Sequence, residues 1–398
     1  MNRKTKILRI IHRLNIGGPT YHSAYLTKYL DNNYFETLLI SGNINEDEEN
    51  GEYILEELGV SSIGIKNMYR EINLFRDYLA YREIKKIIKS FKPDIVHTHA
   101  AKAGFIGRLA AISLNVPIII HTFHGHIFHS YFNSIKTNLF ITLEKFLAKN
   151  TSKIIAISKA QKKELSETYR IANPDKFQII NLGFDLKRFT ENKEVKRIKF
   201  RNEFNLKNDE IAIGIIGRLT AIKNQIFFLN AIKYLKTNSK KKIRAFIVGD
   251  GEDRFNLESH SVELGLDYTT EKDSIHNKLL CFTSWRKDID VVNCGLDIVC
   301  LTSLNEGTPV SLIEAMAAAK PIVSTKVGGV EDIVQNSVNG FLVKSNDLLN
   351  YSKKLLQLVE DQDLRNKMSL RSSEKAVQKF SYLRLINDIE TLYKQLLK

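Results

Sequence analysis

Short apolar runs alternate with amphipathic segments along nearly the whole sequence. In the first half the runs are rich in Ile and Val, and they predict strands at Ile7–Leu14, Thr37–Ser41, Ser61–Ile65, Asp94–Thr98, Pro117–Thr122, Lys153–Ile157 and Phe177–Leu182. The segments between them have helical spacing, which predicts helices at Tyr21–Leu30, Leu74–Phe91, Gly104–Leu114, Ile135–Ala148 and Lys159–Tyr169. Strands that are apolar along their whole length are buried on both faces, as in parallel sheets covered by helices. The pattern therefore predicts a doubly wound α/β sheet.

A second series of the same kind follows a polar connector over residues 185–209. Its expected strands are Ile211–Ile216, Ile243–Val248, Lys278–Thr283, Asp297–Leu301, Pro321–Ser324 and Gly340–Val343. Because 398 residues exceed one ordinary core, we expect a Rossmann-like domain over residues 1–185 and a second one over residues 186–380. The two sheets are expected to face a cleft at the carboxyl ends of their strands, where open α/β sheets bind ligands.

Residues 381–398 are expected to form a terminal helix with an apolar stripe on one side. The stripe consists of Leu385, Ile386, Ile389, Leu392, Tyr393, Leu396 and Leu397. A one-sided stripe has to be buried, so we expect this helix to pack back toward the first domain.

The chain is basic, with 59 Lys and Arg against 45 Asp and Glu and a net charge of +14. Residues 1–190 hold 27 basic and 18 acidic residues, so the first half carries the larger part of the excess. Such an excess attracts nucleic acid, anionic lipid headgroups or anionic substrates. The basic pairs do not alternate with aromatic residues as in a nucleic-acid platform, so we expect no nucleic-acid partner.

The cysteines and the apolar runs indicate the compartment. Cys281, Cys294 and Cys300 are too few for a disulfide framework, and their spacing matches no zinc pattern, so we expect buried thiols in a reducing environment. No uncharged apolar run reaches 18 residues, and basic residues interrupt the run near the N-terminus where a signal peptide would be continuous. We therefore expect a cytoplasmic protein.

The segment from Asn305 to Met316 carries the most informative chemistry. It follows an expected strand and opens a helix, with Thr308 as the expected N-cap and Pro309 as the first helical residue. The exposed amides and positive dipole end of such a turn suit a phosphate. Glu306 and Glu314 flank the turn, and a carboxylate binds sugars by accepting hydrogen bonds from neighbouring hydroxyls. The alternative is a capped helix with solvent-facing glutamates.

Two further features carry a weaker signal. Gly17 and Gly18 follow the first strand, where a backbone without side chains can approach a ligand closely or adopt positive φ; a simple turn is the alternative. Six of the ten histidines lie between residues 97 and 129: His97, His99, His121, His124, His126 and His129. His97 and His99 share a strand face, but no Asp, Glu or Cys joins them at ligand spacing, so no metal site is expected.

The segment NEGTPVSLIEAMAAAKPIVSTKVGG resembles the signature of the retaining GT-B glycosyltransferases of family 4, also called group 1. The resemblance covers nearly the whole chain. IIHRLNIGGPTYHSAYL is similar to the first strand, Gly-Gly loop and first helix of the family, and DIVHTHAAKAGFIGRLAA and VPIIIHTFHGHIF to its fourth and fifth strand segments. IGRLTAIKN resembles the segment that opens the second domain, WRKDI the nucleobase-side loop, and FSY…LYKQL the terminal helix. The implied fold is GT-B, with two Rossmann-like domains.

The resemblance implies roles for individual residues. Arg218 and Lys223 would contact the donor diphosphate, where cations neutralise the departing nucleotide as a metal does elsewhere; two unrelated surface cations are the alternative. Glu306 would bind the donor sugar and Glu314 the ribose. His124 would touch the donor sugar or the reacting oxygens as a neutral imidazole, with His126 as the competing assignment. The implied catalytic residues are His124, Arg218, Lys223 and Glu306, and the implied donor-binding residues are Gly17, Gly18, Arg218, Lys223, Trp285, Glu306, Gly307, Thr308, Pro309, Val310 and Glu314.

The chain departs from the family pattern at a few positions. Pro19-Thr20-Tyr21-His22 follow the Gly-Gly pair where the family often has Glu, which leaves the acceptor contacts of the first helix open. Ala319 stands at a helix C-cap where the family usually has Gly, and alanine in a left-handed conformation costs about 1 kcal/mol. Asp288-Ile289-Asp290 mimics the metal motif of the other glycosyltransferase fold, but at a helix start it is expected to cap. We expect no obligatory metal or other cofactor.

The expected function follows from the resemblance. It is transfer of a hexose or N-acetylhexosamine from a nucleoside diphosphate sugar, UDP more than GDP, to a glycan or lipid-linked saccharide, with retention and an α-glycosidic bond, in bacterial surface polysaccharide biosynthesis. The basic first domain suits peripheral contact with an anionic inner membrane. The alternatives are a GT-B-fold sugar-nucleotide epimerase, a phosphorylase, or a non-catalytic basic lipid- or nucleic-acid-binding protein, and the last leaves Glu306 and Glu314 without a purpose.

Overall fold

The computed structural model describes residues 3–15, 17–44, 50–125, 134–270 and 278–398, which divide into two compact units. Unit 1 comprises residues 1–184 and 382–398, and unit 2 comprises residues 185–381. Among the described residues, none of the helices combines the length and the apolar character needed to span a bilayer. The three cysteines are free thiols and are buried, as expected.

The described residues of unit 1 form a seven-stranded parallel sheet with the order β3-β2-β1-β4-β5-β6-β7. Its strands are β1 (Thr5–Ile11), β2 (Phe35–Ser41), β3 (Ser62–Gly64), β4 (Ile95–His99), β5 (Ile118–Phe123), β6 (Lys153–Ala156) and β7 (Phe177–Ile179). Its helices are α1 (Gly18–Leu30), α2 (Glu52–Leu58), α3 (Leu74–Phe91), α4 (Ala101–Ser113), α5 (Ser134–Lys149), α6 (Lys159–Lys163) and α16 (Tyr382–Leu396), with a π-helical turn at Glu164–Thr168 and a 3-10 turn at Pro174–Lys176.

Unit 2 repeats the architecture, with a seven-stranded parallel sheet in the order β10-β11-β9-β8-β12-β13-β14 among its described residues. Its strands are β8 (Glu210–Ile216), β9 (Lys242–Val248), β10 (Tyr268–Thr269), β11 (Leu280–Phe282), β12 (Ile298–Leu301), β13 (Ile322–Thr325) and β14 (Gly340–Val343). Its helices are α7 (Lys187–Thr190), α8 (Lys193–Glu203), α9 (Gln225–Asn238), α10 (Arg254–Glu263), α11 (Ile289–Gly295), α12 (Val310–Ala317), α13 (Val330–Ile333), α14 (Leu348–Glu360) and α15 (Gln362–Phe380), with a 3-10 turn at Ala221–Lys223.

Two Rossmann-like parallel sheets confirm the predicted fold class. Every strand expected from the sequence is present, with ends shifted by no more than about three residues. The helix expected over Lys159–Tyr169 changes to π-helical hydrogen bonding after Lys163, with Tyr169 N donating to Glu164 O at 3.0 Å. The sequence analysis missed α2 and β10, two short elements without a full helical or strand period.

The strand order defines the edge at which ligands are expected in each sheet. β1 pairs with both β2 and β4, and β8 pairs with both β9 and β12. Successive connections leave these strands in opposite directions, which creates a topological switch point at their carboxyl ends. The segments that follow β1 and β4 in unit 1, and β8 and β12 in unit 2, therefore frame the candidate sites.

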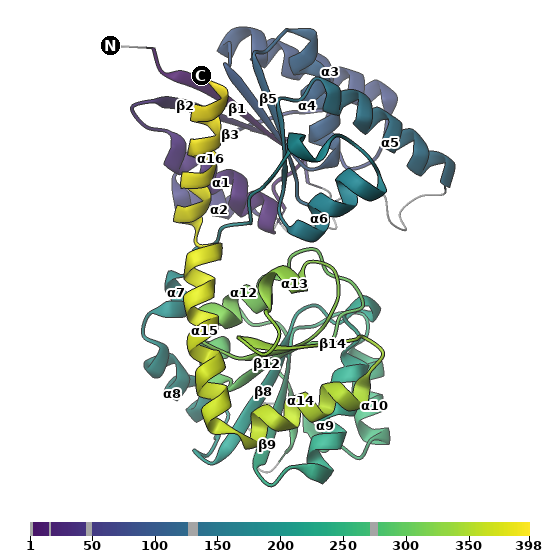
Figure 1. The fold of residues 1–398 in the computed structure, drawn as a ribbon, viewed down its shortest axis with the longest axis vertical. Coiled ribbons are helices and arrows are strands. Elements are labelled where there is room, and N and C mark those ends of the chain that lie inside the picture. Colours follow the sequence, from purple (N-terminus) through teal and green to yellow (C-terminus); the bar gives the residue numbers. More distant parts are fainter. Residues whose placement is uncertain (1–2, 16, 45–49, 126–133, 271–277) are drawn as a thin grey trace. The chain divides into compact units, whose positions relative to one another are not determined.

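After α15 the chain returns to unit 1, where α16 (yellow in Figure 1) packs beside α1. The stripe residues Leu385, Ile389, Leu392 and Tyr393 are buried in a core cluster with residues of β1, β4 and β5. Tyr382, the first residue of α16, donates from its backbone N to Phe184 O at 3.0 Å. Phe184 is the last residue of unit 1 before the chain enters unit 2. Burial of this amphipathic face by apolar strand residues holds the terminal segment on the sheet.

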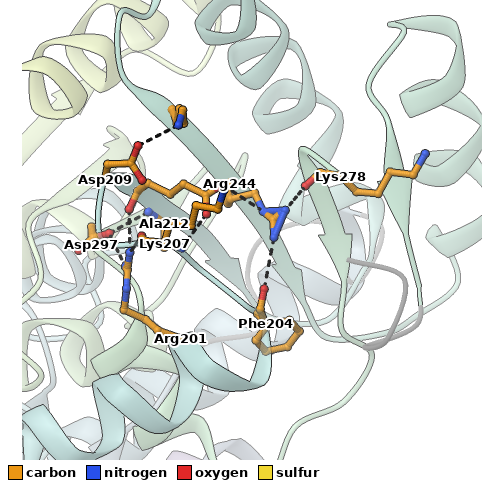
Figure 2. A network of polar contacts seen from close by, with 10 residues as sticks. Arg201, Phe204, Lys207, Asp209, Ala212, Arg244, Lys278 and Asp297 are labelled. Carbon is orange, nitrogen blue, oxygen red and sulfur yellow. Dashed lines mark hydrogen bonds and ion pairs between the residues drawn. The ribbon is translucent and has the colours of Figure 1, made fainter. Parts of the chain in front are cut away.

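A polar network at the amino ends of the strands anchors α8 to the sheet of unit 2 (Figure 2). Asp297 Oδ2 accepts hydrogen bonds from Ala212 N at 2.8 Å and from Arg201 Nη1 at 3.3 Å. Arg244 Nη2 donates to Phe204 O at 3.3 Å. These charged side chains are mostly buried and satisfied, so they serve the fold of unit 2 at the edge opposite to the switch point.

Candidate functional site

The loop after β8 carries both cations implied to contact the donor diphosphate. Gly217 has a φ of 153°, a conformation that favours glycine, and Arg218 follows it. The Arg218 side chain is 67% exposed, and its Nη2 atom lies 3.2 Å from Glu252 Oε2. Gln225 Nε2 donates to Arg218 O at 3.0 Å and fixes the backbone. An exposed ion pair is weak, so this guanidinium is free to exchange its partner for an anionic ligand.

Lys223 and Glu306 meet where β8 and β12 end. Lys223 Nζ donates to Glu306 Oε1 at 2.6 Å, and Ser303 Oγ donates to the same oxygen at 2.6 Å. Only 9% of the Glu306 side chain is exposed. Leu304 N donates to Ile222 O at 2.8 Å, so backbone contacts also join the two loops. The structure thus brings together two of the predicted residues that are 83 positions apart in the sequence.

Two glycines after β13 fix the turn that contains Glu306. Gly328 has a φ of 46°, and a Cβ atom there would lie 2.0 Å from Glu306 O. A Cβ atom on Gly329 would lie 1.8 Å from Gly307 O, and Gly329 N donates to Glu306 O at 3.1 Å. Any side chain at either position would displace the turn. The sequence analysis did not single out Gly328 and Gly329, although a Gly-Gly pair three residues after a strand was the available signal.

The start of α12 differs by one residue from the prediction. The helix begins at Val310 with Pro309 as the N-cap, so Thr308 lies outside it and makes no side-chain cap. Pro309 has a ψ of 101°, which is extended, and its carbonyl accepts a bond from Leu312 N at 3.2 Å. The space around the exposed Gly307 is open, since a Cβ atom there would meet nothing within 4 Å. The turn at 307–310 therefore leads directly into a helix N-terminus, where an anion is favoured.

Glu314 lies in the second turn of α12 and is partly buried. Burial raises the pKa of its carboxyl to about 7, with Asp290 adding to the rise and Arg188 opposing it. This carboxyl is therefore partly protonated near neutral pH in the ligand-free protein.

Trp285 is exposed on a loop that Arg286 holds in place. Arg286 forms a bidentate pair with Glu203 at 2.5 and 2.9 Å, and it also binds Asp288 at 2.8 Å. Asp288 occupies the N-cap position of α11 as expected, but the capping prediction is wrong for its side chain, which binds Arg286 and makes no cap hydrogen bond. An exposed indole on a fixed backbone is suited to stack against a nucleobase.

In unit 1, Gly17 is the N-cap of α1 and Gly18 its first residue. The φ of Gly17 is 164°, an extended conformation open to any residue, so positive φ does not explain the pair. A Cβ atom would lie 3.8 Å from Pro19 at Gly17 and 3.6 Å from Leu182 at Gly18, which is ordinary contact. Local packing thus tolerates a side chain at both positions, so close approach of a ligand stays a prediction and a simple turn stays the alternative.

His124 follows β5 and belongs to a cluster of imidazoles with His22 and His99. His99 Nδ1 lies 3.1 Å from His124 Nε2, and the nearest ring nitrogens of all three lie within 4.8 Å of one another. Burial lowers the pKa of each, to about 3 for His124. The cluster is therefore neutral at physiological pH, and His124, which is partly exposed, can donate or accept a hydrogen bond. His126, the competing assignment, lies outside the described residues.

The sequence analysis overlooked His22 as a member of this cluster, because it lies on α1 rather than in the histidine-rich segment. His97 and His121 are structural. The two nitrogens of His97 bind Tyr393 Oη at 2.6 Å and Thr122 Oγ1 at 2.7 Å, and His121 Nδ1 binds Thr98 Oγ1 at 2.9 Å.

A pocket of unit 2 lies away from the predicted site residues of this unit. It has a volume of about 630 Å³ and lies at the amino ends of β8 and β9, with Arg197, Glu210, Lys242, Lys320 and Arg365 in its lining. The predicted residues of unit 2 lie after the carboxyl ends of the strands, at the opposite edge of the sheet. The switch point, with its glycine-supported turn and paired charges, is the better candidate for chemistry.

Two Rossmann-like units, the second with cations and carboxylates gathered at its switch point, define a glycosyltransferase of the GT-B fold. The sequence matches the family described as Glycosyl transferases group 1 over residues 196–375 and Glycosyltransferase Family 4 over residues 16–188. The chain belongs to glycosyltransferase family 4.

Curated relatives and solved structures agree with this assignment. The chain is 31% identical over 337 residues, 84% of each chain, to the Escherichia coli UDP-Gal:alpha-D-GlcNAc-diphosphoundecaprenol alpha-1,3-galactosyltransferase. It is 25% identical, over 79% of each chain, to the putative glycosyltransferase EpsD of Bacillus subtilis. Anabaena HepE in complex with UDP has a TM-score of 0.79 at 20% identity and covers 98% of this chain and 100% of its own. A glycosyltransferase from Rickettsia africae has a TM-score of 0.80 at 21% identity over all of both chains.

Proposed function

We propose that this glycosyltransferase transfers a hexose or N-acetylhexosamine from a UDP-sugar, or less readily a GDP-sugar, to a lipid-linked saccharide and forms an α-glycosidic bond with retention. The observation that carries the proposal is the contact of Lys223 and Ser303 with Glu306 at the switch point of unit 2. A buried carboxylate beside a cation can hold sugar hydroxyls while the cation faces the diphosphate.

Stabilisation of the leaving nucleotide is the main catalytic contribution. Arg218 and Lys223 supply two positive charges to the diphosphate, and the turn at 307–310 adds backbone amides and the N-terminus of α12. Glu314 accepts from the ribose hydroxyls, and Trp285 stacks on the base. Because two cations already neutralise the developing charge, no obligatory metal is proposed.

Retention proceeds by front-face displacement without a covalent intermediate. Glu306 is a poor nucleophile because its Oε1 atom already accepts two short hydrogen bonds, which stabilise its charge. His124 is neutral and hydrogen bonds to the donor sugar or to the reacting oxygens.

The acceptor is proposed from the relative. The Escherichia coli enzyme is named for a GlcNAc linked through diphosphate to undecaprenol. A related lipid-linked saccharide fits the basic charge of this chain and a place on the cytoplasmic face of a bacterial membrane, in the biosynthesis of a surface polysaccharide.

The test is a donor screen with UDP- and GDP-sugars and a synthetic GlcNAc-diphosphate-lipid acceptor, followed by NMR of the product. We expect an α-linked product from a UDP-sugar. Lys223→Met and Glu306→Gln should each lower kcat/KM by about 10²–10³-fold, the usual effect of removing a charge-stabilising group. Lys233→Met, at an exposed lysine of α9, should leave the rate unchanged.

Two outcomes would contradict the proposal. Interconversion of nucleotide sugars without an acceptor would identify an epimerase, and a requirement for free phosphate would identify a phosphorylase. A β-linked product would overturn retention alone.

A further inference from the structure

The amino-terminal end of α3 in unit 1 exposes large apolar side chains to solvent. We refer to them together as the α3 tip; they are Ile72 (61% exposed), Leu74 (85%), Phe75 (71%) and Tyr78 (55%). Single exposed apolar residues are common, but a group of four within seven positions marks a surface that contacts something apolar. The helix has its own buried face, formed by Ala80, Ile84 and Ile88, so the tip is not needed for the core.

The solvent face of α3 combines the tip with positive charge. At 3.6 residues per turn, Phe75, Tyr78, Arg82, Lys86 and Lys89 fall within an arc of about 80°. The face therefore starts with two aromatic rings and continues with three cations, without a carboxylate at these five positions. Residues 66–92 as a whole hold eight Lys and Arg against three Asp and Glu. An apolar end followed by a basic helical face is typical of segments that bind anionic bilayers.

The tip is held at the edge of the sheet where His99 and His124 lie. α3 follows β3, so its amino end lies at the carboxyl ends of the parallel strands. Lys102 Nζ, at the start of α4, lies 2.7 Å from Asp77 Oδ1 and also donates to Glu71 O. His12 Nε2 lies 3.1 Å from Tyr69 O, which joins the preceding loop to the end of β1. These contacts hold the α3 tip at the carboxyl edge of the unit 1 sheet, the same edge at which His99 and His124 lie.

We propose that the α3 tip inserts into the interfacial region of an anionic phospholipid bilayer while Arg82, Lys86 and Lys89 contact its headgroups. The purpose of this surface rests on the proposed lipid-linked acceptor, whose saccharide lies at headgroup level when its lipid is in the bilayer. Insertion of the tip brings the carboxyl edge of the unit 1 sheet to that level.

The charge favours a bilayer over a second copy of the chain as the occupant. Two copies that met through this face would place two basic segments against each other, with repulsion between them. A bilayer that contains anionic lipid offers both an apolar phase for the aromatic and aliphatic side chains and counter-charges for the cations.

Vesicle flotation with the full chain tests the proposal, with vesicles of phosphatidylcholine alone or with 30 mol% phosphatidylglycerol (about one lipid in three, enough for a negative surface potential). We expect the wild type to float with the anionic vesicles and much less with the neutral ones. The double variant Leu74→Ser with Phe75→Ser should lose at least about fivefold of the bound fraction, because apolar burial is removed. Phe255→Ser, at an exposed phenylalanine of α10 in unit 2, is the matched control and should float as the wild type does.

A second variant tests the charges. Arg82→Gln, Lys86→Gln and Lys89→Gln together should remove the preference for anionic vesicles, whereas Lys344→Gln, Lys353→Gln and Lys367→Gln, which remove three exposed charges from unit 2, should not. Equal flotation of the wild type with both vesicles, or of the Leu74/Phe75 variant and the wild type, would overturn the proposal. So would light scattering that shows a wild-type dimer and a monomeric Leu74/Phe75 variant.

Failure of this surface and failure of the proposed function give different results. With a short-chain, water-soluble acceptor the Leu74/Phe75 variant should keep the wild-type turnover, and it should lose turnover only with an acceptor embedded in vesicles. Flotation without any transfer reaction would support the membrane surface and contradict the proposed acceptor. Transfer without flotation would support the proposed acceptor and contradict the membrane surface.

Discussion

In its proposed role at the ribose, Glu314 has to be ionised to bind the donor, whereas the folded ligand-free protein favours its protonated form. Burial raises its pKa from 4.5 to about 7, so the folded state holds the proton more tightly than the unfolded chain does. Stability therefore falls as the pH rises from about 4.5 to 7, by at most about 3 kcal/mol for a shift of this size. A carboxylate that accepts hydrogen bonds from ribose hydroxyls, in contrast, is needed in its ionised form.

This conflict predicts a pH dependence of donor binding. Because only the ionised carboxylate binds the ribose well, the Kd of a UDP-sugar should rise about tenfold between pH 8 and pH 6 for a pKa of about 7. Isothermal titration at several pH values measures it. Glu314→Gln should bind weakly at every pH and should unfold at a higher temperature than the wild type at pH 8. A Kd that is constant in the wild type would contradict the assignment of Glu314 to the ribose.

The histidine cluster leads to a second prediction at the scale of single residues. Burial is the main reason that the pKa of His22 is lowered, and the charges of Arg9 and Arg384 add to the decrease by repulsion. A divalent cation between the three imidazoles would meet the same repulsion. Since the proposed mechanism assigns neutralisation of the diphosphate to Arg218 and Lys223, dialysis against EDTA should leave the transfer rate unchanged. The opposite result would be that EDTA abolishes activity, that zinc restores it in the wild type, and that zinc fails to restore it in His22→Ala. This result would identify His22, His99 and His124 as a metal site.

At the scale of elements, the end of α12 contains an avoidable strain. Ala319 has a φ of 60°, as expected for the position where the family usually has Gly. Ala319→Gly should stabilise unit 2 by roughly 0.5–1 kcal/mol, since glycine adopts this conformation without a steric penalty but loses more entropy on folding. The change in the free energy of unfolding is measured in urea, with hydrogen exchange of unit 2 peptides as the readout.

The neighbouring alanine provides the control. Ala318 has a φ of −74°, which any residue adopts, so Ala318→Gly should destabilise unit 2. If both substitutions lower the stability, the left-handed conformation of Ala319 is not the source of the strain.

At the scale of the whole molecule, the chain leaves unit 1 at Phe184 and returns at Tyr382, so the fold of unit 1 depends on its last helix. Tyr393 of α16 is buried, and its Oη atom lies 2.6 Å from His97 Nδ1 and 3.5 Å from Arg9 Nη2. Tyr393→Phe removes the partner of these two nitrogen atoms and should destabilise unit 1 by about 1–3 kcal/mol.

Hydrogen exchange resolved by peptide checks this prediction. Protection should fall in the strands of unit 1 and should be unchanged in unit 2, because the lost contacts belong to unit 1 alone. Tyr53→Phe, at an exposed tyrosine of α2, should change neither unit. Equal loss of protection in both units would show that the two unfold together.

The sequence predicted the sheets well because their strands are continuous apolar runs, a signal that depends on each segment alone. It placed α3 at Leu74–Phe91, as observed, and the strands near their observed ends. It failed where neighbours decide the geometry. Pro309 became an N-cap rather than the first residue of α12, and the Asp288 carboxylate turned to Arg286 instead of the α11 amides. Spacing alone gave neither result, and the Arg286 that binds Asp288 is itself held by Glu203, which lies 83 positions away.

The amino-acid sequence by itself determined the class of fold, the family and the residue types available for a diphosphate and two sugars, because periodicity and local motifs are properties of short segments. The tertiary structure decided which of those residues meet. Lys223 and Glu306 lie 83 positions apart, and only the pairing of β8 with β12 puts their side chains 2.6 Å from each other. His22 joined His99 and His124, and the apolar end of α3 stayed outside the core, because both outcomes follow from the packing of elements that are distant in the chain.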